Sequence, residues 1–198
     1  MSGIIGSYHN IRGSGIVNKL GTDGQVFTST GVGGTAGFED AAGGGKVGQV
    51  LQAVKTDTQD TTDDNTWTDI GSLSQAITPV ATSSKILILF SVNAAADDND
   101  HVAVRLMRTS TAIFIGADTS ETGRNCTTAI RGHSGQVYDV FLMSGQYLDS
   151  PSSTSAITYK VQGNSNDQFF INRSHDEAGT TVQRPVTSSS LTLIEVLA

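Results

Sequence analysis

Short apolar runs separated by turn residues fill the chain from Lys46 onward. The run KILILFSV (85–92) is apolar at nearly every position, which is typical of a strand buried on both faces. Two other runs alternate between apolar and polar positions, which predicts strands that bury one face. Their inward-facing side chains are Val102, Val104 and Leu106 in HVAVRLMR, and Ile157, Tyr159 and Val161 in AITYKVQ.

The remaining runs extend this pattern to the end of the chain. They are VLQAVKT (50–56), WTDI (67–70), AIFIG (112–116), QVYDVFLM (136–143), QFFINR (168–173) and SLTLIEVLA (190–198). The pattern indicates about ten strands at near-regular spacing and no helix. The three prolines, Pro79, Pro151 and Pro185, fall in the gaps. The sequence therefore predicts an all-β fold, an antiparallel β-sandwich of the jelly-roll kind.

The first 45 residues have a different composition. They hold thirteen of the 22 glycines, and their apolar residues come singly or in pairs. Neither helical nor strand periodicity persists, so this segment cannot offset its own ordering entropy. We expect an extended glycine-rich N-terminal arm over residues 1–45, ordered against a partner, and a β-sandwich domain over residues 46–198.

Charge and cysteine content exclude several classes of protein. The net charge of −7 disfavours a nucleic-acid partner, because no cationic patch is available to replace counterions. Cys126 is the single cysteine, which excludes an intrachain disulfide and a cysteine zinc cluster. The longest apolar run, ILILF, is far shorter than the roughly 20 residues of a membrane helix. The N-terminus lacks a secretory signal, so we expect a protein made in a cytoplasm without membrane insertion.

The glycine-rich stretch from Gly31 to Lys46 does not predict a nucleotide site. Gly31 to Ala36 loosely matches a dinucleotide fingerprint, but no strand–turn–helix unit surrounds it. Asp40 occupies the position where a Walker loop before Gly45-Lys46 needs its first glycine. We expect no cofactor.

Two acidic clusters, residues 57–65 and 97–101, are candidate calcium loops because they alternate carboxylates with other residues. Neither is followed by a glycine-turned loop with a distal Glu. Asp and Asn also favour turn geometry, and solvated hairpin turns explain both clusters. The sequence predicts no metal site.

Candidate catalytic groups are equally weak. His133 precedes Ser134, but a nucleophile elbow requires glycine where Gln136 stands. The four histidines are scattered in polar, turn-like contexts. We predict no catalytic residue.

Exposed aromatic side chains are the remaining candidates for a site. Trp67, Tyr147 and Tyr8 could stack on sugar rings, as aromatic residues do on lectin-like surfaces. The favoured interpretation places Trp67 in the core of the sandwich, where a single tryptophan usually packs.

Several segments resemble a module found in virion proteins of aquatic tailed bacteriophages, often labelled tail-fibre-like. They are KLGTDGQVFTSTG (19–31), VLQAVKTDTQ (50–59), ITPVATSSKILILFSVN (77–93), YLDSPSSTSAITYKVQ (147–162), FFINRS (169–174) and SSSLTLIEVLA (188–198). The resemblance implies a homotrimeric, non-enzymatic fibre or decoration protein without a cofactor.

The sequence and the resemblance together predict a structural protein of the virion surface. The arm would dock on other virion proteins, of the capsid or the tail, through the isolated side chains of Ile4, Ile5, Tyr8 and Ile11. The surplus apolar face of KILILFSV suits a threefold interface between copies. Only 45 residues precede the module, which favours a short fibre, a knob or a decoration. The alternative is a lectin-like, receptor-binding tail-fibre tip that recognises a host surface glycan.

Overall fold

The computed structural model describes residues 25–29, 36–40, 46–62, 65–97, 99–117, 125–132, 138–176 and 185–197. The backbone divides into two compact units, Met1–Lys46 and Val47–Ala198. The described residues are strands and loops without a helix, so none of them forms a helix able to cross a membrane.

The first unit contains a two-stranded antiparallel hairpin. Its strands are β1 (Gln25–Ser29) and β2 (Ala36–Asp40), and Phe27 lies opposite Phe38. The sequence pattern did not predict this hairpin, because each strand has two hydrophobic residues, too few to establish a period. The role of this unit as an anchor stays a prediction.

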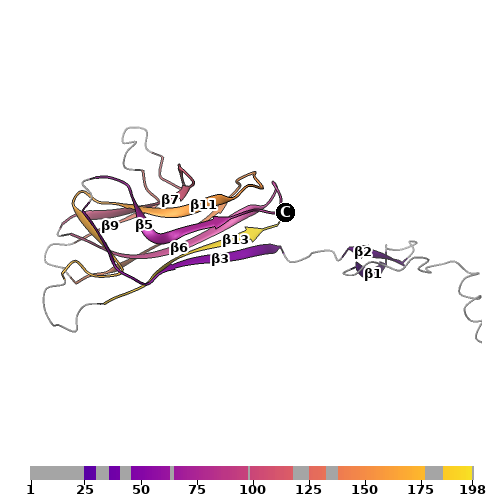
Figure 1. Ribbon diagram of the computed structural model, residues 1–198, viewed down its shortest axis with the longest axis horizontal. Coiled ribbons are helices and arrows are strands. Elements are labelled where there is room, and N and C mark those ends of the chain that lie inside the picture. Colours follow the sequence, from indigo (N-terminus) through magenta and orange to yellow (C-terminus); the bar gives the residue numbers. More distant parts are fainter. Residues whose placement is uncertain are drawn as a thin grey trace, which may run out of the picture. The chain divides into compact units, whose positions relative to one another are not determined.

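The second unit is a sandwich of two antiparallel sheets, as the sequence predicted (Figure 1). The first sheet contains β3 (Val47–Lys55), β4 (Gln59–Thr62), β6 (Lys85–Ala96), β10 (Phe141–Asp149), β12 (Gln168–Ile171) and β13 (Ser189–Val196). The second contains β5 (Thr68–Ile77), β7 (His101–Arg108), β8 (Thr111–Ile113), β9 (Thr128–Arg131) and β11 (Ile157–Asn164). The chain passes repeatedly from one sheet to the other, which closes a single core between them.

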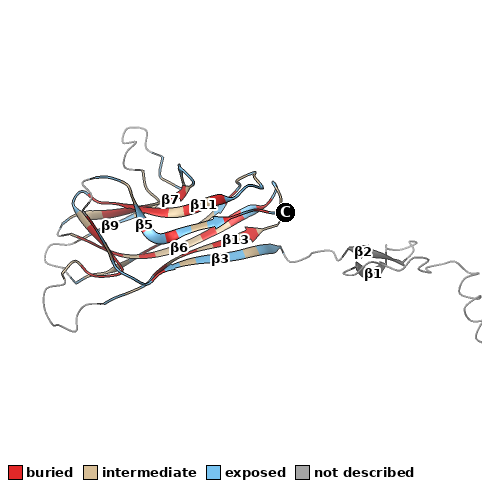
Figure 2. Ribbon diagram, viewed as in Figure 1, coloured by how far each residue is buried: buried red, intermediate tan, exposed pale blue. Residues whose placement is uncertain are grey.

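Alternating side chains of both sheets fill this core. The predicted inward-facing residues of β7 and β11 are all buried. In β6, Ile86, Ile88, Phe90 and Val92 point inward and are also buried. The expectation that this strand is buried on both faces is wrong for its second face, where Leu87 and Leu89 stay partly exposed (Figure 2). They lie on the outer side of the first sheet.

A β-bulge explains why the sequence pattern captured only the start of β5. Its buried residues Ile70, Leu73 and Ile77 are not spaced by multiples of two throughout. Ser72 has a φ of 65°, and the register against β11 shifts at this point. Four residues of β5, 70–73, lie opposite the single residue Val161, and this odd excess of three breaks the period that sequence analysis detects. Strands β4 (QDTT) and β9 (TAIR) were missed because each has four residues, and these include no apolar side chain in β4 and only two in β9.

A buried polar network joins the two sheets. The hydroxyl of Tyr159, in β11, donates to Asp149 Oδ2 in β10 at 2.6 Å. Arg108, in β7, donates from Nη1 to both carboxylate oxygens at 2.9 and 3.1 Å. Burial raises the pKa of Tyr159, and the hydrogen bond to Asp149 raises it further. The network therefore stays intact across neutral pH.

Asn172 connects four segments of the first sheet. Its Nδ2 donates to the carbonyl oxygens of Lys55 and Asp57, both at 2.9 Å, and Ser189 Oγ donates to its Oδ1 at 2.6 Å. Its backbone N–H donates to Asn93 O at 2.8 Å. Asn172 is fully buried and has a φ of 63°, a left-handed conformation that Asn tolerates better than most residues.

We predict that Asn172→Ala destabilises the sandwich far more than Asn65→Ala. Asn65 has the same φ of 63° but is exposed, so it controls for the backbone effect, about 1 kcal/mol. Asn172→Ala loses three further buried hydrogen bonds, which contribute about 3 kcal/mol together. Urea unfolding of both variants measures the difference. Equal destabilisation would show that the side-chain hydrogen bonds contribute nothing.

Candidate functional site

The outer face of the second sheet carries a pocket of about 320 Å³. Three neighbouring strands form its floor: Asn164 of β11 lies opposite Ala103 of β7, and Ala103 lies opposite Ala129 of β9. The two alanines leave the sheet surface low at this point, while the surrounding positions carry larger side chains. The hollow therefore results from residue size along one cross-strand row.

Larger side chains from four segments form the walls. Trp67 stands directly before β5, and Cys126 lies in the segment before β9. His101 begins β7, and Asn166 lies in the turn between β11 and β12. Trp67 is partly exposed, so the indole forms both wall and surface.

A chain of polar contacts fixes the indole of Trp67. The guanidinium carbon of Arg105 lies 4.2 Å from the centre of the Trp67 ring, in cation–π geometry. Arg105 Nε donates to Gln162 Oε1 at 2.8 Å, and Gln162 Nε2 donates to Asp69 Oδ1 at 2.7 Å. Lys160 donates to the other oxygen of Asp69 at 2.7 Å. Partial burial raises the pKa of Asp69, but the hydrogen bonds from Lys160 and Gln162 outweigh it, so the pKa is lowered.

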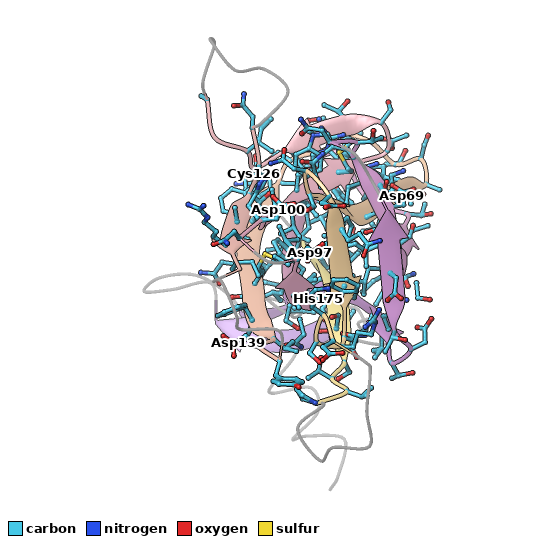
Figure 3. The ribbon with its side chains drawn as sticks, turned by 90° about the vertical axis from the view of Figure 1, so that its left-hand side faces the viewer. Asp69, Asp97, Asp100, Cys126, Asp139 and His175 are labelled. Atoms are coloured by element: carbon cyan, nitrogen blue, oxygen red, sulfur yellow. The ribbon has the colours of Figure 1, made fainter. Side chains whose placement is uncertain are left out.

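Asp100 fixes the turn after β11, which begins next to Asn164 and contains Asn166. Its Oδ2 accepts from Ser165 Oγ at 2.6 Å and from the backbone N–H of Asp167 at 2.8 Å. Its Oδ1 accepts from the backbone N–H of His101 at 2.7 Å and lies 3.1 Å from His101 Nδ1. Figure 3 looks onto this end of the sandwich and labels Asp100 and Cys126. One carboxylate thus ties the turn after β11 to the start of β7.

Asn164 presents an unsatisfied donor at the pocket. Its side chain is 5% exposed, and its Nδ2 has no hydrogen-bond acceptor among the described residues. A buried amide without a partner costs roughly 1–3 kcal/mol. Such a group is expected where a ligand supplies the missing acceptor.

The described residues of the pocket lining carry no permanently charged side chain, since they are Trp, His, Ala, Cys and Asn. Burial raises the pKa of the Cys126 thiol, so the thiol is protonated and poorly nucleophilic at neutral pH. The site is therefore suited to binding a neutral group and lacks an activated thiol.

The prediction that Trp67 packs in the core is wrong. The core is closed by aliphatic side chains together with Phe90, Tyr159 and Phe169, and Trp67 is on the opposite side of the second sheet. Tyr147 is partly buried against the core and stacks on Phe114 with ring centres 5.2 Å apart. The proposed anchor residues Ile4, Ile5, Tyr8 and Ile11 lie outside the described residues, as do His133 and Ser134.

The described carboxylates of the acidic clusters bind neighbouring residues of the chain. Lys55 Nζ lies 3.1 Å from Asp57, Arg173 Nε donates to Asp60 at 2.6 Å, and His175 Nε2 lies 3.4 Å from Asp97. Within the described part of the chain, no three His, Cys, Asp or Glu side chains converge as a metal site would require. Asp63, Asp64 and Asp98 lie outside it.

Sequence analysis missed Asn164, Ala103 and Ala129 as a site. The available signal was the small outward-facing Ala103 in HVAVRLMR, on a face where Arg105 is large. The pairing of this position with β9 and β11 is not readable from one sequence, because strand order is a tertiary property.

No protein-family model and no curated protein matches the chain. One similar solved structure is titled "Structure of infectious bursal disease virus Gx strain", with 11% identity and a TM-score of 0.40 over 91% of this chain and 41% of that chain. Another is a crystal structure of the infectious bursal disease virus VP2 subviral particle, with 12% identity and a TM-score of 0.38 over 91% and 46%. This chain spans less than half the length of each of those chains.

We predict that Asp100→Asn weakens the sandwich at pH 6 by about 1–2 kcal/mol, because the turn loses one charge-assisted acceptor. Burial raises the pKa of Asp100, but hydrogen bonds from Ser165, His101 N–H and Asp167 N–H outweigh it and place the pKa below the ordinary value of 3.8. This stabilisation is therefore present above pH 3.8 and is lost as the pH falls through the lower folded-state pKa.

Urea unfolding at pH 6 and pH 3 tests this, with Asp167→Asn as the control, since Asp167 is an exposed carboxylate of the same turn. The difference between wild type and Asp100→Asn should shrink at pH 3. A difference that is independent of pH would contradict the role assigned to the ionised carboxylate.

Proposed function

We propose that this protein is a non-enzymatic structural protein of a phage virion surface, attached through residues 1–45 and displaying the sandwich outward. The observation that carries the proposal is the composition of the described core. Among the described residues, the buried core cluster runs from Ile70 to Leu193, within the second unit. We therefore expect the sandwich to fold without the arm, which would leave the arm available for a partner.

The proposal places the protein in a short fibre or in a capsid or tail decoration, with other virion proteins as partners. Ile4, Ile5, Tyr8 and Ile11 are the proposed docking groups, because isolated apolar side chains on a glycine-rich backbone can fill pockets of a neighbouring protein. The resemblance of the chain to tail-fibre-like modules supports this assignment.

Self-association is the second part of the proposal. One cross-strand row on the outer face of the first sheet is entirely apolar; we call it the apolar row, and it consists of Val50, Ile194, Leu87 and Leu148. Val50 is 60% and Leu148 46% exposed. Burial of such side chains stabilises an interface by about 25 cal/mol per Å² of apolar surface.

Two rows on one side of the apolar row are mainly polar and carry no charged side chain. They are Gln52, Thr192, Leu89 and Gln146, and then Val54, Ser190, Ser91 and Ser144. On the other side of the apolar row, Val196 pairs with the cationic Lys85. A chain with a net charge of −7 would repel its own copies through an acidic surface. Rows without a carboxylate avoid that repulsion, which favours a second copy of this chain as the occupant, and we propose a homotrimer.

We predict that deletion of residues 1–45 leaves a folded protein that does not enter particles. The deletion removes hairpin β1–β2 and the docking groups but no strand of the sandwich. Circular dichroism and thermal melting should stay close to those of the full chain, while occupancy on purified virions falls to background. A full-length variant with Ile4, Ile5, Tyr8 and Ile11 replaced by Ala should show the same loss. Normal occupancy of the truncated protein on purified virions would contradict the anchor proposal.

We predict that residues 46–198 form a trimer and that Leu148→Lys dissociates it. A lysine in the apolar row would bury a charge at the interface, which costs several kcal/mol. Light scattering should give three times the subunit mass for the parent and a lower mass for the variant. Val80→Lys is the control, because Val80 is exposed in the turn before β6 and only its backbone N–H binds Glu195. A monomeric parent at micromolar concentration would leave assembly dependent on the arm or the virion.

A further inference from the structure

We propose that the pocket on the outer face of the second sheet binds one neutral sugar ring of a glycan, between Trp67 and Asn164. This inference goes beyond the attachment role and is independent of residues 1–45. The residues on which it rests are all described residues of the sandwich.

The first argument is the pairing of an aromatic wall with amide groups. Sugar rings have apolar C–H faces and polar edges, so they pack on an indole while their hydroxyls meet donors and acceptors. Trp67 supplies the aromatic surface, held in place by Arg105 at 4.2 Å. Asn164 and Asn166 supply the amides from the turn fixed by Asp100.

The second argument is the unpartnered Nδ2 of Asn164. This donor is buried at the pocket without an acceptor among the described residues, although Gln162, the outward-facing residue two positions earlier in β11, has both its amide atoms hydrogen-bonded. The contrast indicates that this sheet can satisfy the hydrogen bonds of buried amides, and that the Nδ2 of Asn164 is left to donate to a bound group. A hydroxyl fits, because it accepts from Nδ2 and donates elsewhere at the same time.

The third argument concerns charge and size. A phosphate or carboxylate ligand needs a cationic partner, and the described lining residues include no Arg or Lys. A volume of about 320 Å³ is near the lower limit of small-molecule sites, which suits a single ring better than an extended chain. These limits select a neutral monosaccharide unit.

The chain provides its own reporters for this site. Trp67 is the only tryptophan and Cys126 the only cysteine, and both line the pocket. Intrinsic fluorescence and thiol modification therefore each report on this location without labelling or mutation of any other residue.

The test titrates the full-length protein with glucose, galactose, mannose and N-acetylglucosamine while tryptophan fluorescence is recorded. We expect a saturable change for at least one of them, with half-saturation at about 1–10 mM because a single ring makes few contacts. The same sugar should slow modification of Cys126 by iodoacetamide at pH 8.5 with the same concentration dependence. N-acetylneuraminic acid and glycerol serve as a charged sugar and as a polyol without a ring.

Two variants and one control localise the effect. Ala129→Leu fills the pocket at an exposed position, so it should abolish binding without loss of stability. Asn164→Ala should weaken binding about five- to tenfold, since it removes one hydrogen bond. Ala76→Leu makes the same enlargement at an exposed position of β5, outside the pocket lining, and should bind like wild type.

The proposal is overturned if none of the four sugars gives a saturable change, or if Ala129→Leu binds as well as Ala76→Leu. A response to N-acetylneuraminic acid alone would overturn the neutral class, and equal half-saturation by glycerol would overturn the requirement for a ring. Failure of virion attachment would leave these measurements unaffected, because they are made on the isolated protein.

Discussion

The first sheet depends on how a long strand, β6, accommodates two shorter partners on one side. Strand β13 pairs with its first half and β12 with its last residues, so the ladder is interrupted where the two meet. Asn172 closes that interruption: its backbone N–H reaches Asn93 of β6, and its side chain reaches the end of β3 and the start of β13. Without this side chain, buried backbone carbonyls at the junction would lose their donors, which is costly in a dry interior. The strand pairs β3–β13 and β4–β12 would then be joined only through their separate ladders with β6.

Because the first sheet is completed in this way, the side chains on the outer faces are not needed to pack the core. The inner faces supply the aliphatic core, and Arg108, Asp149 and Tyr159 join the sheets at one point through a satisfied polar network. Outward-facing residues are therefore selected by solubility or by partners rather than by packing. That is why the apolar row on the first sheet and the hollow in the second are informative about function, whereas the core is informative only about stability.

The sequence predicted those parts of the fold in which burial follows a local period. Strands β7 and β11 were recognised because their side chains alternate, and the strands of regular pattern sufficed to predict a sandwich. The bulge at Ser72 hid most of β5, because an odd number of extra residues reverses the facing of all that follow. The predicted position of Trp67 was wrong for a different reason. Tryptophan as a residue type favours burial, but Trp67 stands directly before β5, beside the paired Ala103 and Ala129, and this position leaves it partly exposed. The site depends on which strands are neighbours, and a single sequence does not contain that information.

The two outer faces differ in chemistry in a way that makes assembly and ligand binding compatible. The apolar row lies on the first sheet and the Trp67 pocket on the second, so they are on opposite sides of the same sandwich. Association of copies through the first sheet would keep every pocket at the surface.

A single ring in a pocket of about 320 Å³ is expected to bind weakly, because it makes few contacts. In the proposed assembly, several linked pockets on one oligomer, and many oligomers on one particle, would raise the effective concentration of each site for a glycan-covered surface. Weak individual binding combined with many copies would then give attachment that is strong as a whole yet reversible at each contact, as the proposed role on a virion surface requires.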